Sequence, residues 1–292
     1  MKRVLLLYSA LMLFLPGTIF AAGGGWRWER ALAVDDTGTH LKRPISLYWE
    51  PAESRYYVVD TVNARLLSFD DKGVFLKQLR AGGQLNTPVG IARDAAGNFW
   101  VIDRKLNVLQ YIDLKEKTVK GSQVLYPDGT PVFLDKMAMD SVNTLFVLDR
   151  KKGSVLRLSH QLGVAVEYKS DKSESGFFDF KLKKDGVWAL DQKARRITVF
   201  SLEGGIKEHI TLQGEMDFPV SFDIDDGGSI YVIDRHRNNI DVFDRRGQFK
   251  YSFLETGSAR GQLYFPVQIL FDGQGFLCVV NEGNGRVDLY RR

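Results

Sequence analysis

The chain has 292 residues, of which 44% are apolar and 26% are charged, with 28 glycines and one cysteine, Cys278. This balance excludes a disordered chain, a collagen-like repeat and a small scaffold held together by disulfides. A formal charge of +4 is too small to indicate a nucleic-acid-binding protein, so we expect no nucleic-acid partner. The lone Cys278 permits no internal disulfide, and the apolar residues around it predict a buried thiol.

The N-terminus has the pattern of a secretory signal peptide. Lys2 and Arg3 precede an apolar run from Val4 to Phe20, and two small alanines follow that run. The run has 17 residues, whereas a membrane-spanning helix needs about 20 apolar residues. We therefore expect residues 1–22 to be cleaved and the mature chain, 23–292, to be a periplasmic or secreted single domain without a transmembrane segment. An uncleaved N-terminal membrane segment is the alternative.

The next predicted element is a single strand near residues 26–34, where apolar and polar residues alternate. This strand has no hairpin partner of its own. Trp26 and Trp28 are two residues apart and therefore lie on one face of it. We expect them to pack in the core rather than to stack on a ligand.

From about Pro44 to the end of the chain, a short apolar run that ends in an acid or its amide occurs six times. The ends of these runs are 43, 46, 42, 43 and 47 residues apart. The residues that end the runs, called the repeat anchors below, are Asp60, Asp103, Asp149, Asp191, Asp234 and Asn281. Each copy consists of four predicted short strands joined by turns rich in Asp and Gly, which suit β-hairpin turns.

Four strands in each unit of roughly 40 to 50 residues are typical of a β-propeller blade. The unit resembles the NHL repeat: the stretch from Ala81 to Asp103 follows that pattern nearly throughout, and the stretch from Gly257 to Tyr290 does so again. The third and fourth copies depart from the pattern, because neither opens with proline. The resemblance implies an all-β, six-bladed NHL-like β-propeller, and it specifies the fold better than the activity.

The two ends of the chain complete this prediction. The sixth copy stops after its third strand. The strand near residues 26–34 would supply the missing fourth strand by pairing with Val287 to Tyr290. This pairing would close the ring and remove an open sheet edge.

Six-bladed propellers of the lactonase and lyase kinds hold a metal at the central channel, which the innermost strands would line. The polar side chains at equivalent positions of those strands are Ser46, Lys136, Asp179, Ser221 and Gln268. One carboxylate beside one lysine is a poor calcium site, which needs several oxygen ligands, so we expect an ion pair between Lys136 and Asp179. The four histidines are scattered across the repeat, which disfavours zinc. We therefore expect no metal or other cofactor, and we assign no catalytic residue.

The loops that follow the repeat anchors are unusually basic. The first six residues of the six loops together contain twelve Lys or Arg and one acid, Glu282. One arginine in each copy has a structural explanation as the partner of its anchor: Arg65, Arg104, Arg150, Arg196, Arg235 and Arg286. The cations left over form a predicted basic face: Lys105, Lys151, Lys152, Lys193, Arg195 and Arg237. Charged loops that are merely solvated are the alternative.

These features favour a secreted or periplasmic binding or scaffold module over an enzyme. Its basic face would attract a protein partner, an acidic glycan or a lipid headgroup over a long range, and salt would weaken that attraction. The alternative function is a channel-mouth enzyme of the lyase or lactonase kind.

Overall fold

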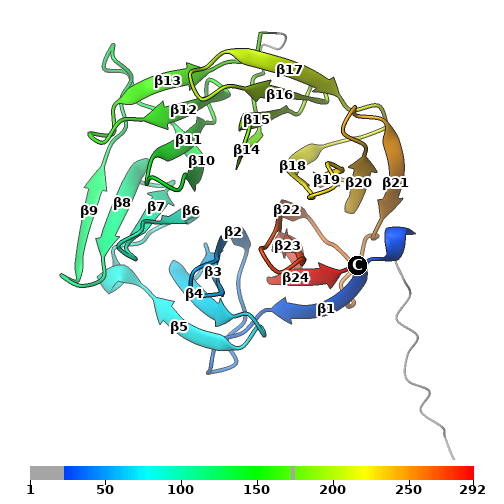
Figure 1. The fold of residues 1–292 in the computed structure, drawn as a ribbon. Helices are drawn as coiled ribbons and strands as arrows, with labels where there is room; N and C mark the ends of the chain where they lie inside the picture. Colours follow the sequence, from blue (N-terminus) through cyan, green and yellow to red (C-terminus); the bar gives the residue numbers. More distant parts are fainter. Residues whose placement is uncertain (1–22, 172–174) are drawn as a thin grey trace, which may run out of the picture.

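A computed structural model describes residues 23–171 and 175–292, and the predicted signal peptide, residues 1–22, lies outside them. The described chain forms six four-stranded antiparallel sheets arranged radially around a central channel (Figure 1). The predicted all-β, six-bladed propeller is therefore confirmed. No helix within the described ranges is long and apolar enough to cross a membrane.

Each sheet is one blade, and in blades one to five the strands follow in chain order from the channel outward. Blade one contains β2 (Pro44–Glu50), β3 (Arg55–Asp60), β4 (Arg65–Asp70) and β5 (Phe75–Leu79). Blade two contains β6 (Pro88–Arg93), β7 (Phe99–Asp103), β8 (Val108–Asp113) and β9 (Thr118–Ser122). Blade three contains β10 (Leu134–Met139), β11 (Leu145–Asp149), β12 (Ser154–Leu158) and β13 (Val164–Tyr168).

The remaining blades follow the same plan. Blade four contains β14 (Asp179–Lys183), β15 (Gly186–Asp191), β16 (Arg196–Phe200) and β17 (Ile206–Thr211). Blade five contains β18 (Pro219–Ile224), β19 (Ile230–Asp234), β20 (Asn239–Phe243) and β21 (Phe249–Phe253). Blade six contains β22 (Pro266–Phe271), β23 (Leu277–Asn281), β24 (Arg286–Arg291) and β1 (Arg27–Leu32). Three single turns of 3-10 helix complete the elements: η1 (Gly23–Gly25), η2 (Ala81–Gly83) and η3 (Glu282–Asn284).

The N-terminal strand closes the ring, as the sequence predicts. β1 pairs antiparallel with β24, so that Trp28 lies opposite Tyr290. Trp26 is 4% exposed and its ring lies 5.8 Å from that of Tyr231, in the core between blades five and six. The Trp28 indole N–H donates to Asp288 at 2.7 Å. Both tryptophans therefore hold the closing strand in place, because their contacts are with the protein itself.

The repeat anchors are buried at the ends of the second strands, and all six have 0% exposed area. A buried carboxylate needs hydrogen-bond donors, and backbone N–H groups supply most of them. Asp234, for example, accepts from the N–H of Phe218 at 3.2 Å and from that of His236 at 3.0 Å. Each anchor of this kind ties the connection between two blades to the loop after the second strand.

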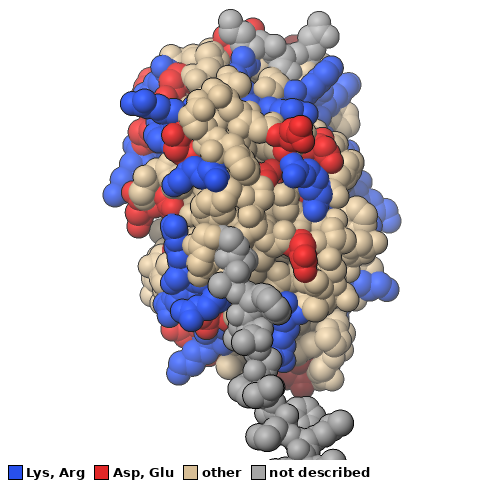
Figure 2. Space-filling model, turned by 90° about the vertical axis from the view of Figure 1, so that its right-hand side faces the viewer, with Lys and Arg blue, Asp and Glu red and all other residues tan. Residues whose placement is uncertain are grey.

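Apolar side chains of neighbouring blades pack face to face between the sheets. Cys278 belongs to the cluster between blades six and one, has no exposed area and is a free thiol, as predicted. Burial raises the pKa of this thiol well above its ordinary value, so it behaves as a small apolar side chain. The outer wall differs from this core: Figure 2 shows one side of it, where basic and acidic side chains are interspersed among uncharged residues.

Candidate functional site

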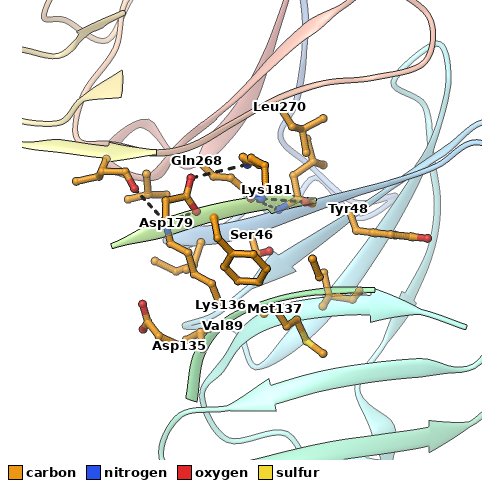
Figure 3. Close-up of a pocket in the computed structure, with 18 of the residues that line it drawn as sticks. Ser46, Tyr48, Val89, Asp135, Lys136, Met137, Asp179, Lys181, Gln268 and Leu270 are labelled. Atoms are coloured by element: carbon orange, nitrogen blue, oxygen red, sulfur yellow. Dashed lines mark hydrogen bonds and ion pairs between the residues drawn. The ribbon is translucent and has the colours of Figure 1, made fainter. Parts of the chain in front are cut away.

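A cavity of about 660 Å³ occupies the central channel. Residues of all six innermost strands line it, together with residues of the loops that follow the repeat anchors (Figure 3). The ring arrangement explains the convergence, because every blade presents the same edge strand to the axis. A volume of this size is ordinary for a small-molecule site.

The structure places four of the five predicted channel residues in the wall of this cavity: Ser46, Lys136, Asp179 and Gln268. Their equivalence also appears in the strand pairing, since Ser46 and Gln268 each lie opposite the residue that precedes an anchor. Ser221 is at the equivalent position of blade five but is fully buried behind the wall. Its hydroxyl donates to Asp179 at 2.7 Å, so its role is to hold that carboxylate.

Asp179 is the buried acid of the channel wall, with 3% exposed area. Lys136 donates to it at 2.9 Å, which is the predicted ion pair, and the N–H of Phe222 donates at 3.1 Å. Burial alone would raise the pKa of Asp179, but the charges of Lys136 and Lys181 outweigh burial and hold the pKa below its ordinary value. The carboxylate therefore stays ionised at neutral pH.

The two lysines reach across the inner wall. Lys136, in blade three, also donates to the carbonyl of Val220 in blade five at 3.0 Å. Lys181, in blade four, donates to the carbonyl of Ile269 in blade six at 2.9 Å. Each ammonium thus spans to a strand two blades away, and the pair makes one side of the cavity polar, positively charged and firmly held (Figure 3).

Residues that directly follow four anchors lie at the mouth of the cavity: Arg104, Arg150, Arg235 and Glu282. Arg235 is paired with Glu282 at 2.6 Å, and Arg104 is paired with Asp135. Among the described residues, the Arg150 side chain has no hydrogen-bond or ion-pair partner. Its guanidinium is therefore available to a ligand.

The cavity as a whole is positively charged. Six basic side chains line it against three acidic ones, which gives a formal charge of +3. Apolar surface is present at the same mouth, where the rings of Phe178 and Phe218 lie 5.9 Å apart in an edge-to-face arrangement. His236 stacks on Phe218 with ring centroids 4.4 Å apart. Cationic and aromatic groups thus share one opening.

The prediction that each anchor is held by its own arginine is wrong for five of the six copies. Only Arg65 pairs with its anchor, donating to Asp60 at 2.7 Å. Arg286 instead binds Asp288, and the nearest acid to Arg196 is Asp171, at 3.8 Å. The reason is that backbone N–H groups already satisfy most anchor carboxylates.

The arginines that directly follow an anchor face the channel mouth instead of the anchor. The anchor ends the second strand at the channel face, so the next side chain points to the mouth. Arg104, Arg150 and Arg235 are in this position and were assigned to the anchors from sequence alone. Their shared spacing of one residue after the anchor is the signal that would have identified them.

The six cations of the predicted basic face are all exposed. They lie on the loops that follow the anchors of blades two to five, two to four residues after each anchor. Two of them contact aromatic rings, with the Lys152 ammonium 3.3 Å from the centre of the Tyr126 ring and the Lys151 ammonium 5.1 Å from that of Phe133. The basic face therefore lies on the loops of blades two to five, and its role in binding stays a prediction.

The residues of the channel do not fit a divalent metal. Each acid in the cavity wall is already paired with a basic side chain: Asp135 with Arg104, Asp179 with Lys136, and Glu282 with both Arg43 and Arg235. Within the described ranges, no group of three or more His, Cys, Asp or Glu lies together. A calcium or zinc ion needs several converging ligands that are free to coordinate it, so we derive no step through a metal.

No protein-family model and no curated protein matches the chain. Solved structures do match. A streptogramin B lyase has a TM-score of 0.68 at 12% identity, over 94% of this chain and 99% of that one. A gluconolactonase from Xanthomonas campestris has a TM-score of 0.68 at 15% identity, over 95% and 93%. A virginiamycin B lyase from Staphylococcus aureus has a TM-score of 0.63 at 15% identity, over 94% of each chain. At these identities the likeness shows the fold alone: the chain is a six-bladed β-propeller.

Proposed function

We propose that the channel mouth binds a small organic anion. The observation that carries this proposal is the unpartnered guanidinium of Arg150 in a cavity of formal charge +3. A guanidinium recognises a carboxylate or phosphate through two parallel hydrogen bonds.

The remaining features of the mouth support a ligand with an apolar part. Phe178 and Phe218 offer ring surfaces beside the cations. The outer cations, Lys105 and its counterparts on the other loops, would attract the anion toward the opening without contacting it once bound. This proposal gives the basic face a steering role, in place of a direct one toward a protein, glycan or lipid headgroup.

The setting of the site rests on the sequence. The pattern of residues 1–22 supports a periplasmic or secreted protein, and the repeat pattern supports an NHL-like propeller. In that setting the ligands available to the mouth would be those of the cell envelope or the medium.

A second candidate is an enzyme of the lyase or lactonase kind that uses the same mouth. The names of the structural neighbours favour enzymatic use of this site over a scaffold role, at the level of fold. The test is release of acid from a panel of lactones, and elimination from a streptogramin B, by the purified protein with and without added divalent metal. Turnover that is lost in Arg150→Glu would support this candidate.

Binding is tested with a panel of aliphatic, aromatic and sugar carboxylates and phosphate monoesters, each beside its neutral amide or alcohol. We expect at least one acid to raise the melting temperature of the wild type, with no effect from its neutral counterpart. The same acid should leave Arg150→Glu unchanged. A panel without any active acid, or equal shifts in both proteins, would overturn the proposal.

A further inference from the structure

A second cavity adjoins the channel mouth at the junction of blades six and one. Its volume is about 540 Å³, and it shares three lining residues with the channel cavity: Arg43, Arg235 and Glu282. The Glu282 carboxylate, only 5% exposed, is held by Arg43 at 2.6 Å and by Arg235 at 2.6 Å. These three side chains form a ridge with the channel cavity on one side and the second cavity, here called the outer groove, on the other.

The outer groove continues the chemistry of the mouth. Its lining includes Lys42, whose ammonium has no partner among the described residues, and the ring of Phe265, which is 37% exposed. Three basic side chains line the groove against one acidic side chain, so its formal charge is +2 with His40 neutral. The outer groove, like the channel mouth, therefore combines an unpaired cation with an exposed aromatic ring.

The backbone beside the groove is strained at two places. Arg43 and Phe265 each directly precede the first proline of a blade and have φ of 56° and 48°. A residue before proline is normally extended, and a bulky residue in the left-handed region is an outlier. Thr87 and Phe218, at the equivalent positions of blades two and five, are not among the described residues with positive φ. The strained residues thus lie in the two connections that flank blade six, and strain that a fold maintains at particular connections is typical of a functional site.

We infer that the ligand is a linear acidic oligosaccharide that runs from the channel mouth over the ridge into the outer groove. This inference deepens the proposed function and rests on it. Arg150 in the channel cavity and Lys42 in the outer groove each carry a cation with no partner among the described residues, and the ridge between the two cavities keeps a net charge of +1 after both of its arginines pair with Glu282. A chain of uronic acid units presents a carboxylate on each ring and apolar ring faces between the carboxylates, which matches both the cations and the exposed rings.

An acidic peptide is the competing occupant with similar charge. Its carboxylates are carried on flexible side chains, so each one loses rotamer freedom when it is held. A pyranose ring holds its carboxylate rigidly and presents a flat apolar face to a side chain such as Phe265. The alternation of cations with aromatic rings in the two cavities therefore favours the sugar.

The experiment is a calorimetric titration with galacturonate and its linear dimer, trimer and tetramer, beside a glutamate tetramer. We expect affinity for the trimer to exceed that for the monomer by at least tenfold. Lys42→Ala and Phe265→Ala should reduce the gain from length at least fivefold while leaving monomer binding unchanged. Lys105→Ala, a cation on a loop away from the groove, is the matched control and should not alter the length dependence.

The outcomes separate this inference from the proposed function. Affinity that is independent of length, or a glutamate tetramer that binds as tightly as the sugar tetramer, would overturn the oligosaccharide while leaving a small-anion site intact. Failure of all galacturonates, with an active acid in the general panel, would also overturn it. Failure of the panel itself would overturn the proposed function.

Discussion

Two arginines near repeat anchors have opposite roles in this propeller. Arg65, five residues after its anchor, is 1% exposed and donates to Asp60 at 2.7 Å and to Asp35 at 2.6 Å. Arg150, one residue after its anchor, is exposed at the channel mouth and has no partner among the described side chains. The first holds the fold of blade one, and the second faces the space where a ligand would bind.

The difference shows that the position within the repeat decides the role of a charge. The anchor ends the second strand at the channel face, so the next residue lies at the mouth. A residue five positions later begins the third strand and returns beneath the loop, where it meets buried carboxylates. Changes at the two positions should therefore separate stability from binding.

The largest effect is expected from Arg65→Ala. This change leaves the buried carboxylate of Asp60 without its cation, and removing one member of a buried ion pair typically costs about 3 kcal/mol or more. The urea midpoint of unfolding should fall accordingly. An unchanged midpoint would mean that the anchors need no cationic partner even in blade one.

Arg150→Glu should have the opposite profile. We expect affinity for an active acid to fall roughly thirtyfold, which corresponds to about 2 kcal/mol for a lost charge-assisted hydrogen bond pair. The free energy of unfolding should change by less than about 0.5 kcal/mol, because the exposed side chain makes no hydrogen bond or ion pair with the described residues. Lys105→Glu makes the same charge change on the outer loop and is the control. Equal loss of binding in both variants would mean that Arg150 contributes only its charge and does not contact the ligand.

Blade five shows what happens where the fifth residue after the anchor is not arginine. Asn239 occupies that place, and Asn239 Oδ1 and Asp241 Oδ2 are both buried without a partner. Burial raises the pKa of Asp241 above its ordinary value of 3.8. In blade six, Arg286 donates to the equivalent Asp288 at 2.8 Å, so that both oxygens of this carboxylate have partners, although burial raises the pKa of Asp288 as well.

We therefore expect Asp241→Asn to stabilise the protein at pH 7. The raised pKa means that the folded protein binds a proton at Asp241 more tightly than the unfolded chain does. The stability that this proton contributes is complete below the ordinary pKa and is lost as the pH rises through the pKa of the folded state. The neutral amide avoids that loss and should raise the free energy of unfolding by about 1 kcal/mol at pH 7. Urea unfolding from pH 3.5 to 7.5 should show the difference shrinking toward acid. A difference that is constant with pH would contradict this account.

The smallest effect is expected from changes in the basic face. Reversal of Lys151, Lys152, Lys193 and Arg195 should slow association with an anionic ligand only a few-fold and make its salt dependence shallower. Dissociation should barely change, because these side chains would steer the ligand without holding it. Stopped-flow binding at low and physiological salt measures both rates. A faster dissociation in this variant would instead mean that side chains of the basic face contact the bound ligand.

The sequence predicts the fold well because each blade is specified by local patterns of apolar and turn-forming residues. The spacing of the anchors and the alternation near residues 26–34 together predict six blades and the closing strand. The ion pair between Lys136 and Asp179 also follows, because equivalent positions of neighbouring blades meet at the channel. Each of these steps needs only the repeat and its register.

The arginines were harder to place, because their partners depend on direction and depth rather than on spacing. Backbone N–H groups satisfy Asp103 and Asp234, so the neighbouring guanidinium groups are free to face the mouth. No pattern in the sequence counts those backbone donors. The same holds for Ser221, whose buried place depends on how closely two inner strands approach.

A crystal structure of the protein with the acid that most raises its melting temperature would show whether the channel mouth is the binding site. We predict that the carboxylate or phosphate of the ligand lies within hydrogen-bond distance of the Arg150 guanidinium, with its apolar part against Phe178 or Phe218. A ligand bound only to the basic face, with the channel mouth free of it, would show that the mouth is not the binding site.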